Sequence, residues 1–267
     1  MIKAAVLGSP ISHSLSPLLH NTAYAQLGLS ASYEAIEVKA HALAQFMDER
    51  DATWSGFSLT MPLKEEVIAY AKHVDDLALR INSANTLYKK AGEWHATSTD
   101  VIGFSKSLEM HKVEIKGHVV ILGAGATARA AAAACDSSQT QITVINRSLA
   151  RVQAMSDAII ESELSFLNWD DLSVLDDADL VISTAPAGVT DSIDLPAKTS
   201  APYFEALYKP WPTPASAKWA SGGGSVIDGL DLLIHQAIAQ IAIFSGADFD
   251  SALMYSKLRE VGLAALK

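Results

Sequence analysis

The chain has 267 residues, enough for one large domain or two modest domains, each with its own hydrophobic core. Apolar residues make up 49% and charged residues 19%, a composition typical of globular proteins and not of disordered chains. Thirty acidic residues against 20 basic ones give a formal net charge of -10, which disfavours nucleic acid or an anionic membrane as a partner.

Short apolar runs alternate with segments of helical periodicity, a pattern typical of α/β proteins with largely parallel sheets. Early in the chain, Ser16 is expected to cap a helix that has Pro17 at its first position, runs to about Leu27 and is stopped by Gly28. The turn at 90–93 is expected to join two strands of a β-hairpin. The predicted strands are 3–7, 33–38, 56–60, 84–89 and 94–97, and the predicted helices are 16–27, 40–50, 65–72 and 103–111.

A second series of strands and helices begins with the apolar run 118–122, whose lack of polar alternation indicates a buried strand. The further predicted strands are 142–146, 180–184 and 225–228. Four helices are predicted: one that ends at 135, one that begins at 149, and two that cover 230–245 and 249–261. We therefore predict an α/β fold of two domains. Residues 1–102, completed by helices within 230–267, form the first, and residues 103–229 form a Rossmann-type second domain.

The sharpest spacing motif is Gly123-x-Gly125-x-x-Ala128, between an apolar strand and a helix. This is the arrangement of a dinucleotide-binding turn: the first glycine permits the turn, the second admits a pyrophosphate, and the small third residue lets helix and strand pack closely. The amino terminus of the helix supplies free N–H groups to the phosphates. Two glycines in such a turn often serve the turn alone, so the motif needs support from the next strand.

The next strand ends at Asn146, where an NAD site usually places an acidic residue for the ribose 2′-hydroxyl. Here Arg147 and Ser148 follow, and Arg151 comes one helical turn later. Two guanidinium groups four residues apart can face the same 2′-phosphate, which favours NADP over NAD. The alternative is a pair of solvated surface arginines. A methyltransferase also uses a glycine-rich turn, but it commonly has an acidic residue at this strand end, and none is present here.

Polar residues in the first half follow apolar strands, where α/β folds gather their ligands. Ser14 and Ser16 precede a helix, where hydroxyl and N–H groups can hold a carboxylate. Capping chemistry alone would explain Ser16 but not Ser14. Lys64, Asn85 and Asp100 each lie just beyond a strand. Lys64 could be an ordinary solvated lysine, but beside a buried Asp100 it could transfer a proton.

Several motifs occur in order along the chain. They are 8–21 (GSPISHSLSPLLHN), 58–64 (SLTMPLK), 84–86 (ANT), 99–103 (TDVIG), 123–129 (GAGATAR), 146–148 (NRS) and 229–236 (GLDLLIHQ). With these motifs the chain resembles the shikimate dehydrogenase family over nearly its whole length.

The resemblance implies reversible NADPH-dependent reduction of 3-dehydroshikimate to shikimate, a step toward chorismate and the aromatic amino acids. It implies that residues 1–102 bind substrate, that 103–229 bind NADP, and that Lys64 and Asp100 form the catalytic pair. The implied substrate contacts are Ser14 and Ser16 for the carboxylate, Thr60, Lys64, Asn85, Asp100 and Gln236 for the ring hydroxyls, and Tyr208 beside the carboxylate and the nicotinamide. The predicted NADP contacts are Gly123, Ala124, Gly125, Ala126, Thr127, Asn146, Arg147, Ser148, Arg151, Thr184 and Gly229.

The chain departs from the family pattern at a few positions. Ser58 and Ser98 stand where the family usually has asparagine, Asn82-Ser83 replaces Gly-Ala, and Ala126 replaces a turn glycine. The loss of two amides near the substrate keeps open a quinate/shikimate dehydrogenase that uses NAD or NADP. A catalytically idle Rossmann-type module that senses NADP or a ring acid is a second alternative.

Cysteine and histidine usage limits the other possible functions and locations. The single cysteine, Cys135, excludes an intramolecular disulfide and favours a reducing cytoplasm. The eight histidines lack metal-site spacing, so no metal is expected. No signal-peptide pattern or membrane-spanning apolar run is present, so we expect a soluble protein that is not exported. The expected partner is a small-molecule substrate, with no nucleic acid and no membrane, and the expected state is a monomer or homodimer.

Overall fold

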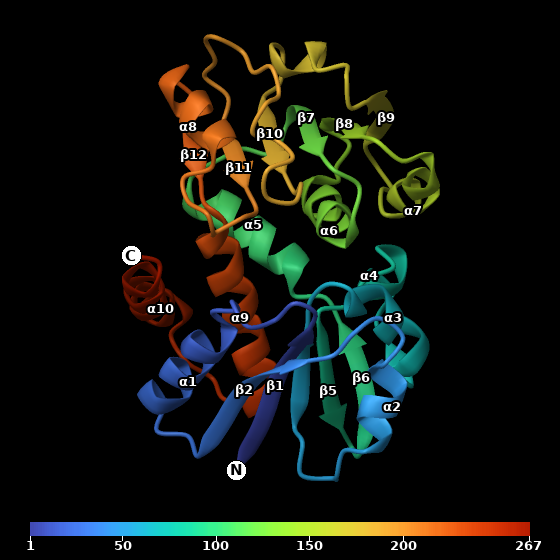
Figure 1. Cartoon of the computed structure of the whole chain (residues 1–267), viewed down its shortest axis with the longest axis vertical. Helices are drawn as coiled ribbons and strands as arrows, with labels where there is room; N and C mark the ends of the chain where they lie inside the picture. The colour runs from blue at the N-terminus through green and yellow to red at the C-terminus, as the bar shows by residue number, and fades with distance from the viewer. The chain divides into compact units, whose positions relative to one another are not determined.

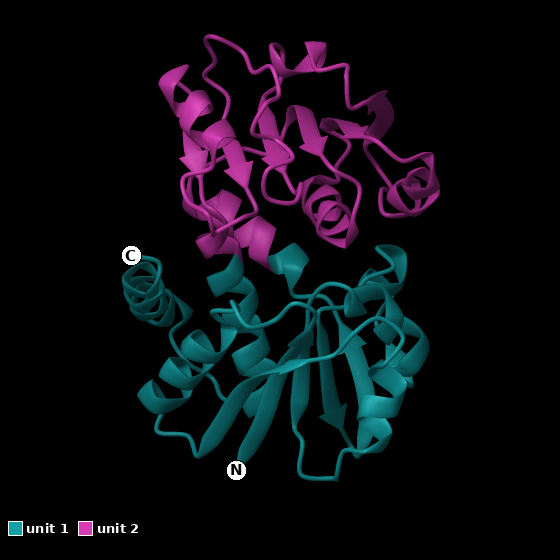
Figure 2. Cartoon of the chain, in the orientation of Figure 1, with its two compact units in different colours: residues 1–102, 233–267 teal, residues 103–232 magenta.

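The computed structural model describes residues 1–267, and the chain divides into two compact units. Unit 1 comprises 1–102 and 233–267, and unit 2 comprises 103–232 (Figure 2). The chain passes from one unit to the other inside two helices, α5 (Asp100–Met110) and α9 (Gly229–Ser245). Unit 2 is therefore inserted into the sequence of unit 1.

Unit 1 is built on a mixed sheet of strand order β2-β1-β3-β5-β6-β4 (Figure 1). β1 pairs in parallel with β2 and β3, whereas β5 is antiparallel to both β3 and β6. The β5–β6 pair is the predicted hairpin. The strands are β1 (Ile2–Gly8), β2 (Ala31–Glu37), β3 (Gly56–Leu59), β4 (His73–Val74), β5 (Thr86–Lys90) and β6 (Glu93–Thr97).

The helices of unit 1 bury an apolar core that includes Leu7, Trp54 and Phe57. Besides parts of α5 and α9 they are α1 (Ser16–Gln26), α2 (Leu43–Asp48), α3 (Leu63–Tyr70), α4 (Asp76–Arg80) and α10 (Ser251–Ala265). Helix α1 ends before Gly28, whose φ of 65° suits glycine. The predicted cap at Ser16 is wrong: Leu15 precedes the helix without a side-chain hydrogen bond, and Ser16 is its first residue.

Unit 2 is built on an all-parallel sheet of order β12-β11-β10-β7-β8-β9. Read from the other edge this is the 3-2-1-4-5-6 order of the doubly wound dinucleotide-binding fold. The strands are β7 (Gly117–Leu122), β8 (Thr140–Asn146), β9 (Glu163–Asn168), β10 (Leu180–Ser183), β11 (Tyr203–Glu205) and β12 (Val226–Ile227). The helices that lie wholly in unit 2 are α6 (Ala126–Cys135), α7 (Val152–Asp157) and α8 (Pro214–Ser221). The predicted α/β fold with a Rossmann-type sheet is confirmed.

Some predicted boundaries are wrong and some elements were not predicted. The predicted helix 40–50 is shortened to α2, and the helix expected from 65 begins earlier, at Leu63. The helix expected from 103 begins at Asp100. The region expected to be helical from 149 begins with a 3₁₀ turn (Leu149–Arg151) before α7. The elements not predicted are β4, α4, β9, a 3₁₀ turn (Ser173–Leu175), β11 and α8.

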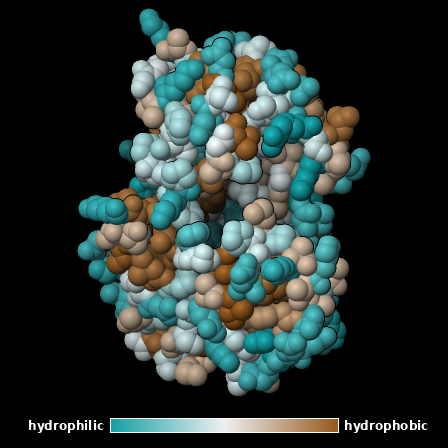
Figure 3. Space-filling view, in the orientation of Figure 1, coloured by the Kyte–Doolittle hydropathy of each residue, from teal (hydrophilic) through white to brown (hydrophobic).

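The surface mixes polar and apolar residues. On the face shown in Figure 3, patches of hydrophobic residues lie among hydrophilic ones. Large apolar side chains that are exposed include Leu18, Leu79, Leu149 and Leu253. None of the helices is both long and apolar enough to cross a membrane.

Candidate active site

In unit 1, the loops that follow β1, β3 and β6 and the loop that precedes β5 meet along one side of the sheet, where those strands end or begin. This side is called the site edge of the sheet. β1 and β3 run in parallel and end there, at Gly8 and Leu59. Because β5 is antiparallel to β3, it begins at that edge with Thr86, and β6 returns to it at Thr97. The carboxyl ends of three strands and the start of a fourth thus bring loops 9–15, 60–62 and 98–99 together. The N–H of Ser9 donates to the carbonyl of Met61 at 3.0 Å, which joins the first two loops.

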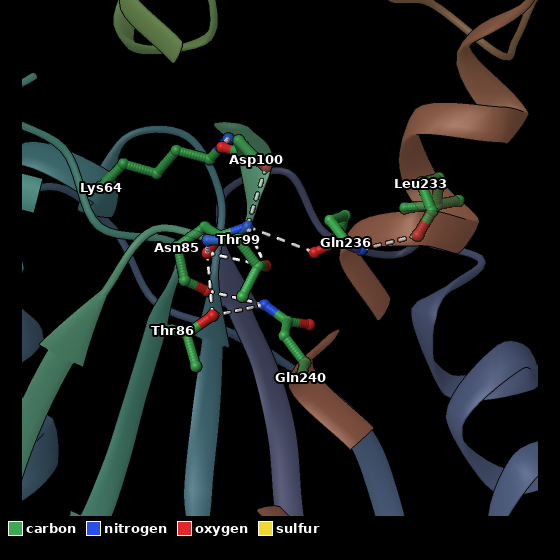
Figure 4. A network of polar contacts seen from close by, with 8 residues as sticks. All are labelled: Lys64, Asn85, Thr86, Thr99, Asp100, Leu233, Gln236 and Gln240. Carbon is green, nitrogen blue, oxygen red and sulfur yellow. Dashed lines mark hydrogen bonds and ion pairs between the residues drawn. The ribbon is translucent and has the colours of Figure 1, made fainter. Parts of the chain in front are cut away.

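The closest ion pair at this edge joins Lys64 and Asp100. Lys64 Nζ lies 2.6 Å from Asp100 Oδ2, and the two side chains are only 14% and 8% exposed. Lys64 is in the first turn of α3, and Asp100 is the first residue of α5. Asn85 Nδ2 donates to the other carboxylate oxygen of Asp100 at 2.8 Å (Figure 4). The carboxylate is therefore held from two sides, away from bulk water.

Asn85 is the centre of the buried polar network at this edge. Its Oδ1 accepts from the N–H of Thr99 at 2.8 Å and from Thr86 Oγ1 at 2.8 Å, which fixes the amide orientation. Its Nδ2 also lies 3.2 Å from Gln236 Oε1 on α9. The structure thus brings Lys64, Asn85, Asp100 and Gln236 into one connected group (Figure 4).

Ser14, Ser16 and Thr60 lie on loops of the same edge. Ser14 is half-buried, and its Oγ accepts from the N–H of Ser16 at 3.2 Å. Ser16 is buried at the start of α1. Thr60 follows β3 directly, is half-buried, and donates its N–H to the carbonyl of Leu7 at 2.9 Å. Hydroxyl groups and the amino terminus of α1 therefore lie at the edge that also holds the Lys64–Asp100 pair.

In unit 2, the glycine-rich turn between β7 and α6 contains two glycines with different surroundings. Gly123 has a φ of 111°, and a Cβ there would lie 2.7 Å from Thr184 Oγ1, so only glycine fits without a shift. In front of Gly125 the space is open, since no heavy atom lies within 4 Å of where a Cβ would be. Ala126 begins α6 immediately afterwards, without a side-chain cap. The start of α6 therefore has no side-chain cap and adjoins the open space at Gly125, an arrangement that suits an anion at a helix amino terminus.

The strand end next to this turn carries the two predicted arginines. The N–H of Gly123 donates to the carbonyl of Ile145 at 2.9 Å, which ties the turn to the end of β8. Arg147 and Arg151 are exposed beyond that end, and the Arg147 guanidinium lies 5.8 Å from the centre of the Trp169 ring. Asn146 donates from Nδ2 to the carbonyl of Ser148 at 2.8 Å, which shapes the strand end.

The other predicted cofactor and substrate residues of unit 2 lie near the ends of β7, β10 and β11. Thr184 follows β10 and donates from Oγ1 to the carbonyl of Leu122 at 3.0 Å. Tyr208 is half-buried in the loop after β11. Gly229 starts α9, and its N–H donates to the carbonyl of Leu207 at 3.3 Å. The predicted residues Ala124, Ala126 and Thr127 belong to the glycine-rich turn and the start of α6.

A buried carboxylate that the sequence analysis did not identify binds both sides of the loop that contains Tyr208. Glu205 ends β11 and is fully buried. Its carboxylate accepts from the N–H of Leu207 at 3.3 Å and from Thr213 Oγ1 at 3.2 Å. Burial raises the pKa of Glu205 to about 7, although these hydrogen bonds oppose the shift. This group therefore titrates near neutral pH.

Other polar residues beside the predicted ones were also missed. Thr86 and Thr99 hold Asn85, and Gln240 on α9 donates to the carbonyl of Asn85 at 3.0 Å. One signal for Gln240 was present in the sequence, because it follows Gln236 by four residues and so lies on the same face of a helix.

Comparison with known proteins gives a consistent result over the whole chain. Residues 6–87 match the family "Shikimate dehydrogenase substrate binding domain", and residues 107–190 match "Shikimate / quinate 5-dehydrogenase". A shikimate dehydrogenase (NADP(+)) from Ignicoccus hospitalis is 32% identical, and the alignment covers 91% of this chain and 93% of the relative.

Solved structures agree with the sequence comparison. The shikimate dehydrogenase of Mycobacterium tuberculosis is 35% identical, with a TM-score of 0.85 over 97% of this chain and 100% of that one. The Thermus thermophilus shikimate 5-dehydrogenase in complex with NADP(H) and shikimate is 30% identical, with a TM-score of 0.86 over 97% and 99% of the two chains.

Proposed function

This chain belongs to the shikimate dehydrogenase family, and on that premise we propose that it catalyses the reversible NADPH-dependent reduction of 3-dehydroshikimate to shikimate. The reaction makes it an oxidoreductase that acts on a CH–OH group, in the route to chorismate and the aromatic amino acids. The observation that carries the proposal is the Lys64–Asp100 pair, 2.6 Å apart and bound to the buried Asn85 network.

Substrate binding is assigned to unit 1. The hydroxyls of Ser14 and Ser16, at the amino terminus of α1, are suited to the substrate carboxylate. Thr60, Asn85 and Gln236 are proposed to hold the ring hydroxyls, together with the catalytic pair. The position of these residues at one sheet edge supports the assignment, because donors and acceptors from separate loops can then surround one small ring.

Lys64 is proposed to move the proton. When the ketone is reduced, Nζ gives a proton to the carbonyl oxygen, and in the reverse direction it takes the hydroxyl proton back. Asp100 orients Nζ through their hydrogen bond, and Asn85 orients Asp100. Because both members of the pair are nearly buried, the proton passes between groups of fixed geometry.

Unit 2 is assigned to NADP. The open space at Gly125 and the uncapped start of α6 fit a pyrophosphate, while Arg147 and Arg151 fit a 2′-phosphate. The remaining predicted contacts are Gly123, Ala124, Ala126, Thr127, Asn146, Ser148, Thr184 and Gly229, with Tyr208 beside the nicotinamide. The bound cofactor supplies or accepts the hydride at the substrate carbon that bears the reacting oxygen.

The assembly and the compartment are further parts of the proposal. A monomer or homodimer is expected, and gel filtration with light scattering distinguishes the two. The only cysteine, Cys135, is a buried free thiol, which supports a reducing cytoplasm as the compartment.

The test is a spectrophotometric assay of NADP and NAD reduction with shikimate and with quinate. The proposed function requires turnover of shikimate with NADP at a kcat/KM well above that of quinate or of NAD. Comparable turnover of quinate would favour the quinate/shikimate alternative. Binding of NADP without turnover of any ring acid would instead identify an idle sensing module.

A further inference from the structure

Ser58, which stands where the family usually has asparagine, is already engaged with two buried partners. It lies in β3 and is 4% exposed. Its Oγ accepts from the Tyr33 hydroxyl at 2.6 Å and donates to Gln240 Oε1 at 2.7 Å. Donor and acceptor are therefore both used inside the protein, and the role of this hydroxyl is to hold Gln240.

Gln240 is a buried amide whose orientation is fixed by the backbone. Its Nε2 donates to the carbonyl of Asn85 at 3.0 Å and to Thr86 Oγ1 at 2.9 Å (Figure 4). A carbonyl only accepts, so Nε2 must face β5 and Oε1 must face Ser58. These three hydrogen bonds of the amide therefore tie α9 to β3 and to the start of β5.

Asn85 forms hydrogen bonds with two residues of α9 that lie one helical turn apart. Gln240 holds its backbone carbonyl, and Gln236 Oε1 faces its side-chain amide at 3.2 Å. The Thr86 hydroxyl, which accepts from Gln240, donates a hydrogen bond to Asn85 Oδ1. The position of Asn85 is therefore coupled to that of Gln240, while the N–H of Leu59 also donates to the Asn85 carbonyl at 2.7 Å.

We propose that Ser58 and Gln240 form a positioning pair: Ser58 fixes the Gln240 amide, and Gln240 sets α9 and Asn85 in the arrangement in which Gln236, Asn85 and Asp100 engage the substrate. The inference rests on the proposed function. The inference also explains how a serine can replace the family's asparagine at position 58. Ser58 acts through Gln240 and not on the substrate.

The test compares Gln240→Leu with the matched control Tyr33→Phe. Each removes hydrogen bonds from the same buried chain and should lower the melting temperature. Only Gln240→Leu removes the hydrogen bond of α9 to the Asn85 carbonyl, so it should raise KM for shikimate roughly tenfold, the loss expected for one well-placed hydrogen bond, and lower kcat as well. Tyr33→Phe leaves Ser58 able to donate to Gln240 and should keep both constants within about twofold. The Kd for NADP should be unchanged in both variants.

A double-mutant cycle tests the link between Ser58 and Gln240. Ser58→Ala should raise KM in the wild-type background and have little further effect in Gln240→Leu, because its partner is already gone. If Gln240→Leu does not fold, Ser58→Ala compared with Tyr33→Phe carries the same test.

The possible outcomes separate this inference from the proposed function. Equal kinetics of Gln240→Leu and Tyr33→Phe in an enzyme that turns over shikimate would overturn the positioning pair alone, and so would additive effects in the cycle. A wild-type enzyme with no turnover of shikimate would overturn the proposed function and this inference with it.

Discussion

Lys64 has a single carboxylate partner, and that carboxylate is fixed in turn by Asn85. If Lys64 moves the proton, Lys64→Ala should lower kcat by roughly 10² to 10⁴, with a smaller change in KM. Steady-state kinetics with shikimate and NADP measure both constants. Lys106→Ala is the control, since Lys106 is an exposed lysine paired only with Glu109. A kcat within a few-fold of wild type would show that Lys64 has another role.

Arg147 and Arg151 allow a prediction about cofactor choice. If each guanidinium pairs with the 2′-phosphate, Arg147→Ala or Arg151→Ala should lower kcat/KM for NADP about tenfold. The use of NAD, which lacks this phosphate, should hardly change. The NADP preference of the wild type should also shrink at high salt, because ions screen these exposed charges. Equal losses for NADP and NAD would contradict the assignment.

The sequence pointed to single site residues better than to the contacts between them. Lys64, Asn85 and Asp100 could be predicted because each lies next to a strand end, where ligands gather. Their mutual contacts depend on the antiparallel turn-back of β5 and β6, which the hairpin pattern only partly indicates. Gln240 shows only its four-residue spacing from Gln236, and Glu205 carries no local pattern at all. Glu205 is fixed as a buried carboxylate only by the packing of β11 and its loop.

At the scale of elements, the turn between β7 and α6 gives a paired prediction. Gly123→Ala should lower the stability of the protein, because φ is 111° and the new methyl group would press on Thr184. Gly125→Ala should leave stability nearly unchanged, because its φ is -81° and nothing lies within 4 Å of the new Cβ. That methyl group would instead occupy the space proposed for the pyrophosphate.

Thermal denaturation and NADP titration distinguish these two effects. We expect Gly123→Ala to lose roughly 1 to 3 kcal/mol of unfolding free energy, the usual cost of a strained backbone. We expect Gly125→Ala to keep its melting temperature and bind NADP at least tenfold more weakly. Unchanged NADP affinity in a well-folded Gly125→Ala variant would remove the pyrophosphate from this turn.

Elements with strong local signals could be predicted, whereas those fixed by packing could not. Glycine at 28 and the hairpin turn at 90–93 gave correct ends for α1 and for the β5–β6 pair. Strand β9, which was missed, lies at a sheet edge, and none of its residues is fully buried. Strand β11 has three residues, too few for a periodic signal. Its strand character comes from the pairing with β10 and β12.

For the molecule as a whole, the buried Glu205 predicts how stability depends on pH. Its pKa is raised from 4.5 to about 7 in the folded state, so folding favours the protonated form. This contribution is complete below about pH 4.5 and is lost as the pH rises through 7. Glu205→Gln cannot ionise. Relative to this variant, the wild type should lose up to about 3 kcal/mol of unfolding free energy between pH 5 and 8.

The comparison with Glu205→Gln is needed because His20 gives the opposite slope. Burial lowers the pKa of His20 from 6.5 to about 3, so its contribution is present above pH 6.5 and is lost in acid. His20 is intact in both proteins, and its effect cancels in the difference. Urea denaturation at several pH values measures that difference. Parallel curves for the two proteins would mean that Glu205 stays ionised on folding.

The insertion of unit 2 into unit 1 reverses the order in which the ribosome completes the two units. Residues 103–232 are all synthesised before α10 and before the part of α9 that belongs to unit 1, although unit 1 begins the chain. Until then β3 lacks the α9 residue Phe244 that packs on Gly56, and α1 lacks its packing partner α10. Unit 2 can therefore fold first on the emerging chain, while the first 102 residues still lack the part of unit 1 that completes their fold. Asn85 meets Gln236 only in the last stage of synthesis, so a chain cut short after residue 232 should bind NADP and fail to bind shikimate.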